Sequence, residues 1–192
     1  MRDGEAARLD RHRRRDHRSA ELGDSLTREY ASGRVGTCWS VATELQKLGR
    51  RLVGEWTTEA THPQMPGVVV AGSSTFEWLD GECFVIARSH HEHPDFPNAV
   101  SIIGDTDGNH MHYFDSRGVY RLYALTMMDE GWSIAMGRDA PADSFASPGA
   151  PFSQRMTYCF EDADQKMSGK GVSSTDDVNW EDDLQITYQR VS

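Results

Sequence analysis

The sequence has few cysteines, no long apolar run and fewer basic than acidic residues. Its three cysteines, Cys38, Cys83 and Cys159, form no C-x-x-C pair, which indicates neither a disulfide framework nor a zinc knuckle. No stretch of about 18 apolar residues could form a membrane-spanning helix, and the first residues lack the apolar core of a signal peptide. The sequence therefore predicts a reduced, cytoplasmic setting and no membrane partner.

The charge balance and the missing motifs exclude further classes. The chain carries 30 acidic against 20 basic side chains, a formal charge of -10, and an acidic body repels the phosphates of nucleic acids. There is no G-x-S-x-G elbow, no P-loop and no Rossmann glycine pattern. No pair of carboxylates falls on one inward strand face, so acid/base hydrolysis is not indicated. We predict no nucleic-acid partner and favour a protein that is not an enzyme.

The N-terminal segment differs from the rest of the chain. Residues 1–34 contain nine Arg against seven acidic residues and few sizeable apolar groups, so they cannot bury enough surface to offset their ordering entropy. A tail for anionic surfaces would use Arg11 and Arg13–Arg15, but interspersed acids dilute this patch. We predict a disordered or mis-started extension over residues 1–39 and a folded domain over 40–192.

The folded part begins with a short helix and continues as strands. Ser40 can cap a helix with Val41, Leu45 and Leu48 at helical spacing, and Gly49 is predicted to end it. Ten strand-like runs follow: Leu52–Thr61, Val68–Trp78, Glu82–His91, Ala99–Asp105, His110–Phe114, Val119–Met128, Gly131–Arg138, Ser153–Glu161, Lys166–Ser174 and Leu184–Arg190.

Short turns join most of these runs, so neighbouring strands should pair as antiparallel hairpins. No helical segment of a dozen residues lies between strands, which excludes a doubly wound fold. Alternation aligns Arg121 with Tyr123 in one run and Tyr188 with Arg190 in the last. Whether such an arginine points inward as an anion anchor or outward beside a covered patch stays open. The pattern predicts an all-β, antiparallel up-and-down barrel of about ten strands.

One feature links the first strand to the last. Gly54-Glu55-Trp56 opens the first run, and Tyr188-Gln189-Arg190 closes the last. If the sheet closes, these strands lie side by side, and the guanidinium of Arg190 can lie over the indole of Trp56, a contact of roughly 0.5–2 kcal/mol. We therefore assign Gly54, Trp56 and Arg190 to barrel closure.

The closure signal is accompanied by further segments that carry a family resemblance, namely Phe76–Gly81, Ile103-Gly104-Asp105, Tyr113–Val119 and Trp180–Arg190. From Leu52 to Arg190 the chain resembles the lipocalin-like bacterial proteins of unknown function in the calycin superfamily. It is distantly similar to nitrobindin and to fatty-acid-binding-protein barrels. The resemblance implies a calycin-like barrel with a cavity for a small molecule.

The leading hypothesis is a barrel that binds a small hydrophobic or anionic ligand inside. Aromatic side chains would line the cavity, and one of two arginines would hold the anion. The predicted ligand-binding residues are Trp56, Trp78, Arg121, Tyr123, Trp132, Arg155 and Tyr188. A barrel filled by its own aromatic side chains is an open alternative, and so is a homodimer.

Histidines supply a second hypothesis. His110 and His112 share one strand face, and His62 and His91 lie elsewhere in the N-terminal half, so a metal or haem site could form among them. Nitrobindin-like barrels, by resemblance, hold haem iron through a histidine in the C-terminal half, whereas here no His occurs after His112. We therefore predict no cofactor, with a haem- or metal-dependent scavenger of reactive nitrogen or oxygen species as the alternative.

Overall fold

The structure is a computed structural model that describes residues 42–79, 81–104, 110–137 and 152–191. One helix precedes ten strands. Their bounds are α2 Ala42–Leu52, β1 Gly54–Thr61, β2 Val70–Trp78, β3 Val85–His91, β4 Ala99–Ile103, β5 His110–Asp115, β6 Tyr120–Met128, β7 Gly131–Met136, β8 Ser153–Glu161, β9 Lys166–Ser174 and β10 Glu181–Arg190. The predicted extension over residues 1–39, the Ser40 cap and Arg138 lie outside the described residues.

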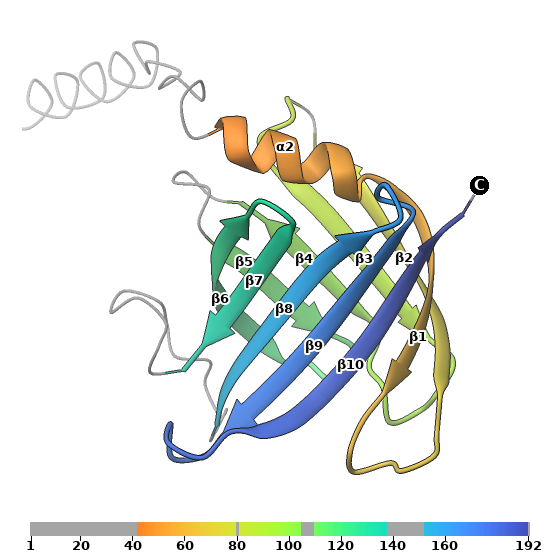
Figure 1. The fold of residues 1–192 in the computed structure, drawn as a ribbon, viewed down its shortest axis with the longest axis vertical. Helices are drawn as coiled ribbons and strands as arrows, with labels where there is room; N and C mark the ends of the chain where they lie inside the picture. The colour runs from red at the N-terminus through yellow and green to blue at the C-terminus, as the bar shows by residue number, and fades with distance from the viewer. Residues whose placement is uncertain (1–41, 80, 105–109, 138–151, 192) are drawn as a thin grey trace, which may run out of the picture. The chain divides into compact units, whose positions relative to one another are not determined.

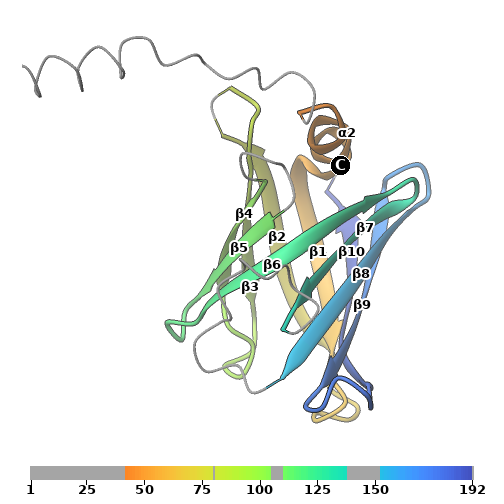
Figure 2. The same ribbon diagram turned by 90° about the vertical axis from the view of Figure 1, so that its left-hand side faces the viewer.

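The strands form a closed antiparallel barrel in which every strand pairs with its neighbours in sequence and β1 pairs with β10 (Figures 1 and 2). The predicted all-β barrel of ten strands with a short preceding helix is therefore confirmed. Because side chains alternate across each strand, one row faces the interior and the other faces outward. In β1, for example, Trp56, Thr58 and Ala60 are buried, and the residues between them are exposed.

The closure between β1 and β10 has the contact expected from the sequence. Trp56 pairs with Arg190 in the strand register, and the guanidinium carbon lies 4.2 Å from the centre of the indole ring. Arg190 Nη1 donates to the carbonyl of Val53 at 2.8 Å and Nε donates to that of Asp164 at 3.1 Å, while Nη2 donates to Arg51 O. The arginine thus joins the last strand to the end of α2.

The helix α2 lies across one end of the barrel and buries Leu45, Leu48 and Leu52. The prediction that Gly49 ends this helix is wrong, because the helix continues to Leu52. A β-carbon at Gly49 would overlap the ring of Trp78, so the glycine allows the helix to approach that indole closely. Tertiary packing rather than termination explains this glycine. Over the described residues, no helix is long and apolar enough to cross a membrane.

Replacing Arg190 tests the closure. We expect Arg190→Ala to lower the free energy of unfolding by about 2–4 kcal/mol, because it removes the cation–π contact and leaves carbonyl groups without their donor. Arg88→Ala is the matched control, since its side chain is about half exposed and its ion pair among the described residues is a surface one with Glu77. It should cost less than about 1 kcal/mol. Urea unfolding followed by tryptophan fluorescence measures both. Equal effects of the two variants would contradict this role.

Candidate functional site

The barrel interior has two unlike walls. On β2, β3 and β4 the inward rows include small and hydroxyl-bearing residues between larger ones such as Phe76, Val85 and Ile103; the small residues are Gly72, Ser74, Ala87, Ser89 and Ser101. On β5 to β8 and β10 the inward residues are mostly large, and several are aromatic: Tyr113, Tyr123, Trp132, Tyr158 and Tyr188. The hydroxyl-bearing groups therefore gather on one side of the barrel, and most of the aromatic rings lie on the other.

Aromatic rings pack against one another in the large wall. Trp132 stacks on Tyr158 with ring centres 4.2 Å apart, and Tyr158 contacts Tyr188 edge-on at 6.3 Å. Gly169 leaves space for the Tyr158 ring, since a β-carbon there would lie 2.8 Å from that ring. Burial raises the pKa of Tyr158 and of Tyr188, and both hydroxyls stay protonated at neutral pH.

A polar network crosses the interior toward the end of the barrel opposite α2, here called the far end. Asp183 accepts from Gln154 Nε2 at 2.7 Å and lies 2.7 Å from His62 Nε2. Gln154 Oε1 accepts from the Tyr123 hydroxyl at 2.8 Å and from Arg121 Nη1 at 3.3 Å. The register of β10 shifts between Asp182 and Gln185, and this bulge lets Asp183 join the inward network while Asp182 pairs with Lys170 outside.

A second polar group lies at the end of β5. The Tyr113 hydroxyl donates to Asp115 Oδ2 at 3.2 Å, and Arg117 donates to the same oxygen at 2.6 Å. Burial alone would raise the pKa of Asp115, but the hydrogen bonds from Arg117 and from backbone amides outweigh it and lower that pKa. Asp115 therefore stays ionised and already has its own cation.

Four buried side-chain atoms have no hydrogen-bond partner among the described residues: Thr58 Oγ1, His91 Nδ1, Arg121 Nε and Trp132 Nε1. All four belong to residues on the inward rows of β1, β3, β6 and β7. Leaving a buried polar group unsatisfied costs about 1–3 kcal/mol, so native interiors rarely do so without a reason.

The predicted ligand-binding residues divide into three groups. Arg121, Tyr123, Trp132 and Tyr188 lie together in the interior, with Trp56 beside Tyr188 at 6.3 Å between ring centres. Trp78 lies against Gly49 at the helix end, where it helps to cover the barrel.

Arg155 lies elsewhere. It is on the outward row of β8 with its guanidinium 3.8 Å from the ring centre of Trp180, which corrects the prediction of an interior anchor. Its neighbours Gln154 and Met156 occupy the inward row of β8, and alternation therefore turns Arg155 away from the interior.

The four candidate histidines do not come together. His110 and His112 alternate with buried Met111 and lie on the outer face, where His112 stacks on Tyr120. His62 is engaged with Asp183, and His91 alone lies on an inward row. Within the part of the chain that the structure describes, no three His, Cys, Asp or Glu side chains are grouped to hold a metal ion.

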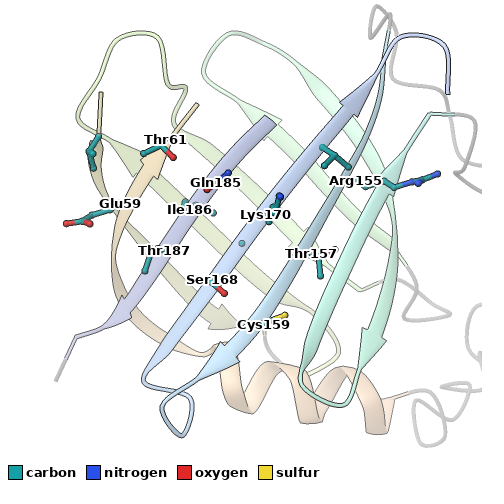
Figure 3. Close-up of a pocket in the computed structure, with 13 residues that line it drawn as sticks. Glu59, Thr61, Arg155, Thr157, Cys159, Ser168, Lys170, Gln185, Ile186 and Thr187 are labelled. Carbon is teal, nitrogen blue, oxygen red and sulfur yellow. The ribbon is translucent and has the colours of Figure 1, made fainter. Parts of the chain in front are cut away.

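A shallow groove of about 600 Å³ lies on the outer face of β1, β10, β9 and β8 (Figure 3). It is lined by outward residues, among them Thr61, Gln185, Lys170 and Arg155. A smaller hollow of about 250 Å³ lies under the β1–β2 loop beside His62 and Asp183, at the far end of the interior network.

Sequence reasoning missed several interior groups, chiefly Thr58, Tyr113, Gln154, Tyr158 and Asp183. Tyr113 and Tyr158 share a strand face with Met111 and Met156, so strand periodicity could have found them. Asp183 gave no such signal, because its inward position depends on the bulge.

Comparison with known structures supports the fold. The crystal structure of Rv2717c from M. tuberculosis matches with a TM-score of 0.56 at 12% identity, over 78% of this chain and 98% of that one. A redesigned β barrel, mFAP1, bound to DFHBI matches with a TM-score of 0.35 at 14% identity, over 74% of this chain and 98% of that one. No protein-family model matches the sequence, and no curated protein matches it. At such low identity the likeness to Rv2717c is one of fold alone.

The burial of His91 predicts a dependence of stability on pH. Burial, reinforced by neighbouring His90, lowers the pKa of His91 below 6.5. The unfolded chain then binds a proton that the folded chain does not, so His91 should reduce stability as pH falls below about 6.5. Urea unfolding between pH 5 and pH 8 should show a shallower loss for His91→Gln than for the wild type. A parallel pH dependence in both proteins would contradict the assignment.

Proposed function

We propose that this chain is a calycin-like, non-catalytic binding barrel that takes a small molecule with an anionic group and an apolar body into its interior. The observation that carries the proposal is Arg121. Its guanidinium lies among the inward residues, and it forms no ion pair with a carboxylate of the described residues. Among the described residues its hydrogen-bond acceptors are both neutral, namely the Tyr123 hydroxyl and the Gln154 amide.

The surroundings of Arg121 suit an anion. Nη1 donates to the Tyr123 hydroxyl and to Gln154 Oε1, both at 3.3 Å, and Nε has no partner. A partly buried cation without a counter-ion is costly, and an entering carboxylate would offset that cost through charge-assisted hydrogen bonds. The fork of an arginine matches a carboxylate better than an ammonium group would.

The neighbouring side chains suit an apolar body. The centre of the Phe152 ring lies 5.2 Å from the guanidinium carbon of Arg121. The rings of Tyr113 and Tyr123 meet edge-on with their centres 6.3 Å apart. Small-molecule sites are commonly apolar surfaces with a few polar groups that fix orientation, and this interior has that composition.

His91 favours haem binding as a second candidate function. Of the four candidate histidines it alone is inward, and its lowered pKa keeps the imidazole neutral, as a metal ligand must be. Haem bound there would supply redox and gas-binding chemistry, and His91 would be its protein ligand. A Soret band that forms with added hemin and is lost in His91→Ala would support this candidate, whereas the same band in both proteins would exclude it.

Two arginine substitutions test the proposed function. Decanoate, a ten-carbon carboxylate, serves as the probe in calorimetric titrations. We expect Arg121→Ala to weaken its binding about 10- to 100-fold, since the charge-assisted bonds are worth about 1.5–3 kcal/mol. Arg155→Ala makes the same chemical change on the outer face and should alter the affinity less than twofold.

The outcomes distinguish binding in the interior from binding in the outer groove. Loss of binding in Arg155→Ala with normal binding in Arg121→Ala would move the site to the outer groove. No decanoate binding by the wild type would contradict the proposed function. Thermal unfolding of each variant, followed by circular dichroism, checks that the barrel is intact.

A further inference from the structure

The loop that joins β1 to β2 lies at the far end of the barrel (Figure 1) and forms one wall of the smaller hollow. The volume of about 250 Å³ has room for a ligand of about eight non-hydrogen atoms. Ten residues line the hollow: Thr61, His62, Pro63, Met65, Pro66, Gly67, Val68, Val69, Asp183 and Gln185. A mostly apolar wall with a single carboxylate has the composition of a site for a small molecule.

Backbone hydrogen bonds hold this loop in shape. Met65 N donates to His62 O at 2.9 Å, and Val68 N donates to Met65 O at 3.1 Å. The second bond closes a turn with Pro66 and Gly67 at its centre, and Gly67 has a φ of +79°, which the second central position of a type II turn requires. A loop that is already ordered loses little conformational freedom when a ligand binds, so the hollow is pre-formed.

Asp183 supplies the charge of this hollow, and its side chain is 12% exposed. Its two oxygens lie 2.7 Å from Gln154 Nε2 and 2.7 Å from His62 Nε2. His62 Nδ1 accepts from the backbone N–H of Gln64 at 3.2 Å, which places the ring proton on Nε2 and makes this imidazole neutral. Among the described residues, the carboxylate of Asp183 therefore has two neutral donors and no cationic partner.

A partly buried carboxylate without a counter-ion is costly, and a cation that reaches it offsets this cost. Arg121 does not reach it, because it donates to the Oε1 atom of Gln154. The adjacent carboxylate is a contrast, since Asp182 is 56% exposed and pairs with Lys170 at 3.1 Å. The bulge in β10 between Asp182 and Gln185 thus directs the carboxylate that lacks a cation toward the hollow.

The wall opposite this carboxylate offers apolar surface. Val68 and Val69 line the hollow and are 37% and 61% exposed, which is unusual for large apolar side chains that lie next to each other. An alkyl chain in the hollow would remove part of this surface from water.

We propose that this hollow binds a small primary amine, with its ammonium group at Asp183 and a short alkyl chain against Met65, Val68 and Val69. The site selects the charge opposite to the one assigned to Arg121, and it does not depend on the proposed function. The formal charge of -10 on the chain also raises the local concentration of cations.

An organic ammonium group fits this lining better than a metal ion does. Ca²⁺ takes about six to eight oxygen ligands, whereas the side-chain oxygens that line the hollow come from Thr61, Asp183 and Gln185. An ammonium group has three donors, which these three side chains can accept, and its alkyl chain matches the apolar wall.

NMR titrations of the full chain, with hexylammonium and the neutral 1-hexanol as probes, test the site. The wild type should bind hexylammonium about 10- to 100-fold more tightly than 1-hexanol, with the largest shifts at residues 62–69. Asp183→Asn should reduce this preference to less than twofold. Asp182→Asn is the matched control, because it removes the same charge at the next residue, and it should keep the preference.

A second pair of variants tests the site without changing the network around Asp183. Val68→Lys places an ammonium group on the wall of the hollow, where it competes with the probe, and should weaken hexylammonium binding about tenfold. Val178→Lys adds the same charge between β9 and β10, at a residue that is 78% exposed, and should change the affinity less than twofold. Thermal unfolding followed by circular dichroism checks that each variant is folded.

Four results would overturn the amine site. Equal affinities of the wild type for hexylammonium and 1-hexanol would show that the hollow ignores charge, and binding of neither probe would leave it without a ligand. An equal loss of preference in Asp182→Asn and Asp183→Asn would reduce the binding to a general attraction between amines and an acidic surface. Equal weakening by Val68→Lys and Val178→Lys would place the probe outside the hollow. The decanoate titrations test the interior separately, so the proposed function stands or fails by them alone.

Discussion

The interior of this protein exists because β1 and β10 pair, and the contact between Arg190 and Trp56 holds that pairing at the helix end. An open sheet of ten strands would expose two edges and would enclose no space. Arg190 covers the indole on one side, while the indole nitrogen donates to the carbonyl of Leu52 at 2.8 Å. The same two residues thus link the pairing of β1 with β10 to the end of α2.

Much of this fold could be predicted from the sequence, because period-2 alternation and turn residues act locally. The strands over Ser153–Glu161 and Lys166–Ser174 have the predicted bounds, and most others differ by a few residues at an end. The helix ran past Gly49 because the reason for that glycine is a ring 29 residues later in the chain, at Trp78. Local sequence patterns do not predict a contact between residues so far apart in the chain.

The site could be predicted only in part, for a similar reason. Arg121 and Arg155 have the same chemistry, and the face on which each lies depends on which of its neighbours point inward. Around Arg155 the inward residues are Gln154 and Met156. Because Gln154 is polar, the sequence near Arg155 does not show clearly which face of the strand points inward. The inward position of Asp183 could not be predicted, because the bulge in β10 reverses the face that period-2 alternation would give this residue.

The contrast between the two inward-reaching arginines carries the functional argument further. Arg190 donates to three backbone carbonyls and covers an indole, so its bonding capacity is used by the fold itself. Among the described residues, Arg121 donates to a hydroxyl and an amide, and its Nε has no partner. Unpaired buried groups lower the stability of the protein without its ligand. A ligand that satisfies them binds the folded state alone and so raises the apparent stability by mass action. If the proposed function holds, stability and ligand recognition are linked through the same few interior atoms, whereas the closure at Arg190 uses none of them.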